Sequence, residues 1–234
     1  MNGIIRILQL QLLFVVSCCG GLPVTSVTET TITLAWSAGN YVNFTINYSG
    51  EDGLNYTTVV PVSGDNVTAT IDDNLEAGQL YTIDIRGHTS SGDTSSVVPV
   101  FSQATKPNPP TYVTVTSAET HSLKVVWLEE NDAVSSYVVR YKDLTNDSAL
   151  MLERSVNDTS LNLTQLQPGH TYSISIAAVY YGVESNQTMP ITNNTVPLPP
   201  VKVTVRALNE SALYVMWYPD SSSTQVSDRL IRTC

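Results

Sequence analysis

Three tryptophans recur along the chain at almost constant spacing, and this repeat constrains the fold more than any other feature of the sequence. Trp36, Trp127 and Trp217 are separated by 91 and 90 residues. Other landmarks of the first half recur 91 residues later, namely Leu75 and Leu166, Gly78 and Gly169, and Tyr81 and Tyr172. A shared period of this kind predicts similar structural units arranged in tandem.

Each tryptophan closes a short run in which apolar residues alternate with others, at 32–36, 123–127 and 213–217. Alternate side chains of a strand share one face, so the tryptophan faces the core with the apolar residues two and four positions before it. A strand before each tryptophan carries a pair of apolar residues. A further alternating strand follows the tryptophan, at 41–48 in the first unit and at 137–141 in the second. The earlier pairs are Leu22 and Val24, Val113 and Val115, and Val203 and Val205.

A corner motif follows in each half, at 75–81 and 166–172. Its glycine tolerates the positive φ of a turn. We expect the ring of Tyr81 or Tyr172 to be buried, with its hydroxyl bonded to a nearby backbone group. Long strands follow at 81–87 and 172–179. Proline-rich segments at 106–110 and 196–200 then interrupt strand pairing and stiffen the joint between units.

The tryptophan strand, the corner and the proline boundary together resemble fibronectin type III repeats. This resemblance implies an all-β fold of tandem immunoglobulin-like Greek-key β-sandwiches, two complete and a truncated third. An immunoglobulin domain would need a cysteine pair between its sheets, and no such pair is expected here. A cadherin repeat would need acidic calcium motifs at its boundaries, where this chain has prolines. Both alternatives are therefore disfavoured. The pair Asp72-Asp73 is the best calcium candidate, and it reads as a solvated loop. The expected organisation is a signal peptide at 1–20 and repeats at 21–106, 107–196 and 197–234.

The amino terminus has the pattern of a signal peptide. Arg6 precedes ten apolar or neutral residues at 7–16, and small residues at 17–20 suit cleavage near Gly20. The apolar run is too short to cross a bilayer as a helix. A bacterial lipoprotein site at Cys18 is an alternative. Cleavage near Gly20 would leave Cys234 as the one remaining cysteine, a free thiol, so no disulfide within the chain is expected.

The formal net charge is −10, which argues against nucleic acid and against an anionic membrane surface as partners. We expect no transmembrane segment in this chain. His88, His121 and His170 stand alone in the sequence, and no phosphate loop, zinc spacing or nucleophile elbow occurs. We therefore expect no enzyme activity, no catalytic residue, no metal and no cofactor.

Asparagine sequons are more frequent than chance predicts. Ten occur, whereas the composition predicts about four, and the excess indicates a glycosylated ectodomain. Asn43 and Asn47 are expected on the outer side of their strand, opposite Phe44 and Ile46, where glycans would shield a sheet face. The candidate N-glycosylation sites are Asn43, Asn47, Asn55, Asn66, Asn146, Asn157, Asn162, Asn186, Asn193 and Asn209.

The segment after the second proline boundary is shorter than the two repeats before it. Its two predicted strands, between Val201 and Trp217, would expose apolar faces with no opposing sheet, and an isolated hairpin is marginal in water. The serine-rich stretch at 221–225 lacks the alternation of a further strand. We expect residues 196–234 to be poorly ordered or to recruit the edge of a partner.

These features predict a glycosylated spacer and ligand-binding surface for cell adhesion, secreted or on the outside of a single-pass receptor. The partner would be an extracellular protein ligand or a cell-surface receptor. Residues 177–179, 182–185 and 193–197 resemble ectodomain repeats of receptor-type protein tyrosine phosphatases, which implies a parent with a catalytic part that this chain lacks. The alternatives are a short secreted decoy form and, without support from any residue, a secreted hydrolase. An Arg-Gly-Asp motif and a paired Trp-Ser motif are both missing.

Overall fold

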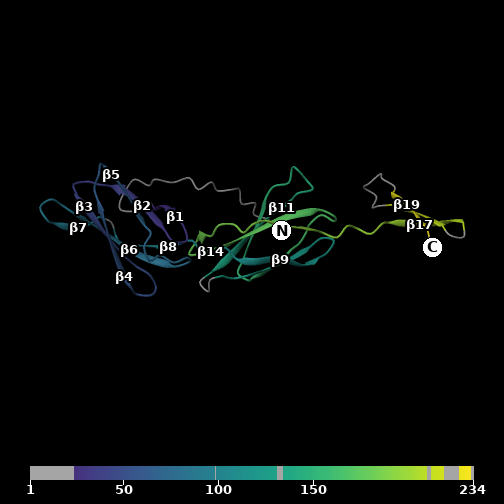
Figure 1. The fold of residues 1–234 in the computed structure, drawn as a ribbon, viewed down its shortest axis with the longest axis horizontal. Helices are drawn as coiled ribbons and strands as arrows, with labels where there is room; N and C mark the ends of the chain where they lie inside the picture. Colours follow the sequence, from purple (N-terminus) through teal and green to yellow (C-terminus); the bar gives the residue numbers. More distant parts are fainter. Residues whose placement is uncertain (1–23, 98, 131–133, 210–211, 219–226, 233–234) are drawn as a thin grey trace, which may run out of the picture. The chain divides into compact units, whose positions relative to one another are not determined.

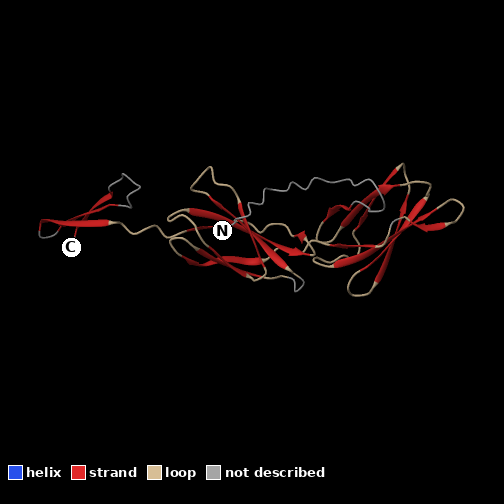
Figure 2. Ribbon diagram, turned by 180° about the vertical axis from the view of Figure 1, so that it is seen from behind, coloured by secondary structure: helices blue, strands red, loops and turns tan. Residues whose placement is uncertain are grey.

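The computed structural model describes residues 24–97, 99–130, 134–209, 212–218 and 227–232. Every regular element in these ranges is a β-strand (Figure 2), which confirms the all-β prediction. Strands β1 to β8 build the first repeat and β9 to β16 the second, while β17 to β19 form a separate three-stranded sheet (Figure 1). The chain divides into two compact units between Pro107 and Asn108, with the short segment Tyr180–Val183 grouped with the first unit. The predicted signal peptide, Cys18, Cys19 and Cys234 lie outside the described residues.

The first repeat has two antiparallel sheets. The smaller has the order β1-β2-β5. The larger has the order β4-β3-β6-β7, and β8 also pairs with β6. The strands are β1 (Val24–Val27), β2 (Ile32–Ser37), β3 (Asn43–Ser49), β4 (Asn55–Pro61), β5 (Asn66–Ile71), β6 (Leu80–His88), β7 (Thr94–Ser96) and β8 (Phe101–Ala104).

The second repeat has the same arrangement. Its smaller sheet has the order β13-β10-β9. Its larger sheet has the order β12-β11-β14-β15, and β16 also pairs with β14. The strands are β9 (Thr111–Ala118), β10 (Leu123–Leu128), β11 (Ser136–Asp143), β12 (Leu152–Val156), β13 (Ser160–Leu163), β14 (Thr171–Tyr180), β15 (Val183–Glu184) and β16 (Ile191–Asn194).

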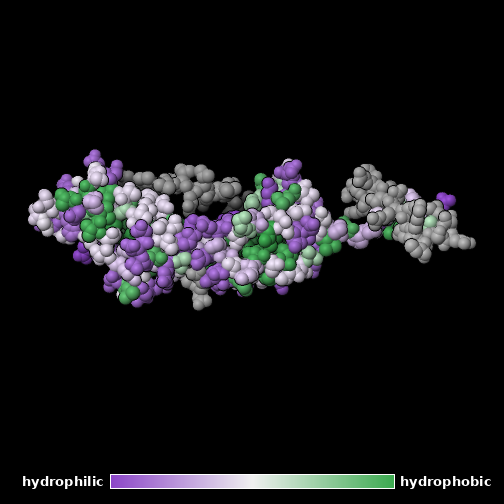
Figure 3. Space-filling model, in the orientation of Figure 1, coloured by the Kyte–Doolittle hydropathy of each residue, from purple (hydrophilic) through white to green (hydrophobic). Residues whose placement is uncertain are grey.

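Alternation along the strands builds one core between the two sheets of each repeat. In the first repeat Trp36 is 7% exposed and meets the ring of Phe44 edge-on, with ring centroids 5.2 Å apart. In the second, Trp127 is 3% exposed and meets Tyr137 edge-on at 5.3 Å. Polar side chains cover most of the visible outer surface of both repeats, with smaller apolar areas between them (Figure 3).

The two corner tyrosines use their hydroxyl groups alike. The Tyr81 hydroxyl accepts a hydrogen bond from the backbone N–H of Glu76 at 2.8 Å. The Tyr172 hydroxyl accepts one from the N–H of Gln167, also at 2.8 Å. Both rings are buried, so each tyrosine joins the core to the loop before its strand. The glycines of these corners, Gly78 and Gly169, have φ values of 67° and 70°.

The segment predicted to begin a third repeat has one strand more than expected, and its assignment to such a repeat stays a prediction. Besides β17 (Lys202–Asn209) and β18 (Ala212–Tyr218), a strand β19 (Ser227–Arg232) pairs with the free edge of β18. It follows the serine-rich stretch, and its six residues alternate too weakly to be recognised from sequence. Val203 and Val205 are 54% and 60% exposed, while Trp217 is only half-buried. The predicted recruitment of a partner edge stays a prediction.

Candidate functional site

The sequon asparagines of the described chain all reach the surface. None of nine is buried, and the side chain of the tenth, Asn209, lies outside the described residues. Asn43 and Asn47 alternate with buried Phe44 and Ile46 along β3, so both face away from the core. The remaining described sequon asparagines lie on strands or loops of both repeats, namely Asn55, Asn66, Asn146, Asn157, Asn162, Asn186 and Asn193.

A shallow polar depression on the first repeat is flanked by two of these sequons. Asn47 on β3 and Asn55 on β4 line it, together with Arg86 and Asp84 of β6. The Arg86 Nε pairs with the Asp84 carboxylate at 2.8 Å. Glycans on the two asparagines would cover this depression, so it is a poor candidate for a protein contact.

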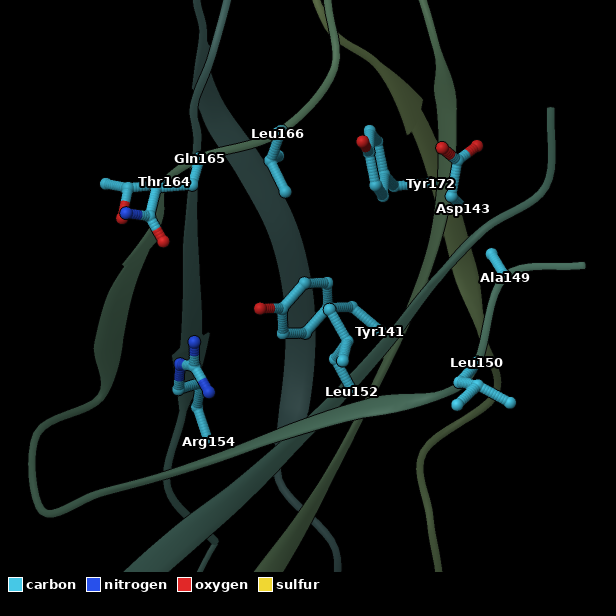
Figure 4. A pocket seen from close by; sticks show the side chains of 10 residues that line it. All are labelled: Tyr141, Asp143, Ala149, Leu150, Leu152, Arg154, Thr164, Gln165, Leu166 and Tyr172. Atoms are coloured by element: carbon cyan, nitrogen blue, oxygen red, sulfur yellow. The ribbon is translucent and has the colours of Figure 1, made fainter. Parts of the chain in front are cut away.

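A hollow of about 240 Å³ opens on the second repeat, and it is the better candidate (Figure 4). It lies between the edge strand β12 and the loop after β13. Tyr141 lies at its centre, with its hydroxyl turned toward the side that Arg154 and Thr164 occupy. Its remaining lining residues come from the strands β11, β12 and β14, from the loop before β12 and from the loop after β13, namely Asp143, Leu152, Tyr172, Ala149, Leu150, Gln165 and Leu166.

Exposed apolar side chains occur on the loop between β11 and β12 and at the start of β12, and two of them, Leu150 and Leu152, line the hollow. Leu150 is 81% exposed, and Met151, Leu152 and Leu144 are each about half exposed. Single exposed apolar residues are ordinary on a protein surface, but four within nine positions favour this surface as a candidate site of interaction. None of the residues that line the hollow is a sequon asparagine.

The two charged residues of the hollow differ in their partners. Asp143 lies 2.7 Å from the Nδ1 of His170. Burial raises the pKa of Asp143, but hydrogen bonds from His170 and from the backbone of Thr145 and Asn146 outweigh it and hold that pKa below its usual value. Arg154 forms no ion pair within the described residues; its Nη1 donates to the Glu153 carbonyl at 3.2 Å.

The three histidines form no cluster, and each contacts other groups of the fold. His88 contacts the hydroxyls of Thr45 and Thr94, and the Nδ1 of His121 lies 2.9 Å from the Leu166 carbonyl. Within the described ranges no group of three or more His, Cys, Asp or Glu side chains could hold a metal ion. No helix of those ranges is long and apolar enough to cross a membrane.

Two buried threonines, which the sequence analysis did not single out, complete the corners. Thr195 is 2% exposed; its hydroxyl donates to the Gln167 carbonyl at 2.6 Å and accepts from the His170 N–H at 3.0 Å. Thr105 does the same with the Glu76 carbonyl and the Gln79 N–H. Their separation of 90 residues, just before each proline segment, is the signal that could have revealed them.

Comparison with known proteins agrees with this architecture. The fibronectin type III domain profile matches residues 19–102 and 108–194. Phosphatidylinositol phosphatase PTPRQ of Homo sapiens is 26% identical over 196 residues, which are 79% of this chain and 8% of that protein. Receptor-type tyrosine-protein phosphatase H of Homo sapiens is 28% identical over 220 residues, 87% of this chain and 18% of that protein.

Tenascins are similar to a comparable extent. Tenascin-R of Gallus gallus is 24% identical over 204 residues, 85% of this chain and 14% of that protein. A solved segment of two fibronectin type III domains from chicken tenascin is 22% identical and has a TM-score of 0.44, covering 75% of this chain and 98% of the segment. The chain spans less than a fifth of the length of the three full-length relatives named.

Proposed function

Since this chain belongs to the fibronectin type III family, whose domains mediate contacts between proteins and are not catalytic, we propose that it is an extracellular, N-glycosylated adhesion module. Its repeats act as a spacer and present a surface to an extracellular protein ligand or a cell-surface receptor. The resemblance to receptor-type phosphatase ectodomains is confirmed by the relatives. Their catalytic domains lie outside the region that matches this chain.

The observation that carries this proposal is the surface position of the sequons. All nine described sequon asparagines are accessible. Glycans on them would keep the exposed strand edges from pairing between molecules. The exposed apolar surface of the second repeat, which contains no sequon asparagine, then remains free to bind a protein partner.

Expression of the full chain in mammalian cells tests the proposal. We expect glycosylated protein in the medium, with a mass that falls on treatment with peptide N-glycosidase, and saturable binding of this protein to intact cells. Retention of the chain in the cytosol without glycans would contradict it. Secreted, glycosylated protein that binds no cell type of a broad panel would contradict the adhesive part alone.

A further inference from the structure

The first repeat has a pair of stacked tyrosines at the position where the second repeat has the hollow. The strand registers place Tyr48 of β3 opposite Ile83 of β6, and Tyr141 of β11 opposite Ile174 of β14, so Tyr48 and Tyr141 hold equivalent positions. Tyr48 faces Tyr56 on β4, and the two rings stack with centroids 5.4 Å apart.

Leucine replaces the second tyrosine in the second repeat. Tyr141 faces Leu152 on β12, which is 49% exposed and leaves space beside the Tyr141 ring. The hollow therefore has a definite origin, a smaller side chain at one position of the edge strand. Its volume of about 240 Å³ is below the range of about 300–1,000 Å³ typical of drug-sized ligands, and it suits one large apolar side chain.

The polar groups of this hollow have unused hydrogen-bonding capacity. The Tyr48 hydroxyl of the first repeat donates to the Asp73 carbonyl at 2.8 Å. Tyr141 is 3% exposed, and its hydroxyl, turned into the hollow in Figure 4, has no hydrogen-bond partner among the described residues. Arg154 has the position that Thr58 holds in the first repeat, and no carboxylate of the described chain is paired with it.

These observations define what the hollow can bind. An arginine without an acidic partner, beside a tyrosine hydroxyl that can also donate, suits a carboxylate. Leu150, Leu152 and Leu166 suit an aliphatic or aromatic side chain next to that carboxylate. Asp143, the acid of the hollow, lies on the side opposite Arg154 and is already bonded to His170 (Figure 4).

We propose that the hollow of the second repeat is a docking site for a protein segment in which an Asp or Glu lies next to a large apolar residue. The apolar side chain fills the space beside Tyr141 and Leu152, and the carboxylate binds Arg154 and the Tyr141 hydroxyl. This inference rests on the proposed protein-binding function and adds its location and the chemistry of the partner. The first repeat cannot bind in this way because Tyr56 occupies the space.

Leu152→Tyr copies the first repeat and is expected to close the hollow without damage to the core. A library of random linear peptides, displayed on phage, is selected against the full chain and counter-selected against this variant. We expect the enriched peptides to share an acidic residue adjacent to a leucine, isoleucine, methionine or phenylalanine. Peptides without this pairing, or no peptide that distinguishes wild type from Leu152→Tyr, would overturn the proposal.

Affinity measurements with a synthetic enriched peptide supply the second test. Arg154→Glu is expected to weaken binding by about tenfold or more, as arginines at interface centres do. Arg86→Glu makes the same change of charge on the first repeat and should leave the affinity unchanged. Equal effects of the two would refute the role of Arg154. If Leu152→Tyr and Arg154→Glu bind intact cells as well as wild type does, the hollow is not the binding site, and the proposed adhesive function is unaffected.

Discussion

Thr195 offers the sharpest test of how the second repeat is held together. Replacement by valine keeps the volume of the side chain and removes its hydroxyl. The Gln167 carbonyl and the His170 N–H then lose the partners that they have at 2.6 and 3.0 Å. A buried backbone group without a partner costs about 1–3 kcal/mol, so the two together should cost about 2–6 kcal/mol. A typical domain has only about 5–15 kcal/mol of stability.

Thr195→Ser is the matched control because it keeps the hydroxyl and loses only a methyl group, worth about 1 kcal/mol. Hydrogen exchange measured by mass spectrometry on the full chain separates the repeats. Since every 1.4 kcal/mol is about tenfold, the valine variant should lower protection of the slowest amides in β11 and β14 by about 30-fold or more. Strands β3 and β6 of the first repeat should be unaffected. Equal losses in the serine and valine variants would refute the role of the hydroxyl.

Three further predictions concern the cores and one charge pair. Trp127→Ala should destabilise the second repeat by about 3–5 kcal/mol, and an unchanged thermal transition would contradict its place in the core. Gly87→Ala should cost about 1–3 kcal/mol, measured by urea unfolding, because the added Cβ would approach the Tyr41 ring to 2.5 Å; unaltered stability would show that the ring moves freely. The pKa of Asp143 is lowered by folding, so its stabilising effect is present above about pH 4 and is lost as the pH falls through the lowered value. The gap in unfolding free energy between wild type and Asp143→Asn should therefore narrow on acidification, and a gap independent of pH would contradict this.

The core was predictable from sequence because it depends on features that recur within a few residues of each other. The alternation ending at Trp36 and Trp127 identifies the inner face of one strand, and the corner motif identifies Tyr81 and Tyr172. Local periodicity of this kind suffices to assign a face to a strand. The all-β tandem architecture follows from the repetition of these two features.

The candidate site was not predictable in the same way, because it depends on which residues face each other across two strands. Tyr48, Tyr56 and Tyr141 are visible in the sequence, but only the registers show that Tyr56 and Leu152 occupy equivalent positions. Register is set by pairing over the whole sheet and is not marked by any short motif. That Arg154 has no acidic partner among the described residues likewise depends on which side chains lie around it in space.

The separation between equivalent residues of the two repeats changes near the hollow, as the strand registers show. Equivalent residues are 91 apart at Trp36 and at Tyr81, but 93 apart at Tyr48 and 96 apart at Tyr56. The separation of equivalent residues thus grows from 91 to 93 at the central strands β3 and β11, and by a further three residues at the edge strands, because the loop before the edge strand grows from residues 50–54 to residues 144–151. Loops tolerate such insertions and carry binding surfaces, while a core does not. The longer loop of the second repeat brings Ala149 and Leu150 to the hollow, so the departure from the period and the candidate site coincide.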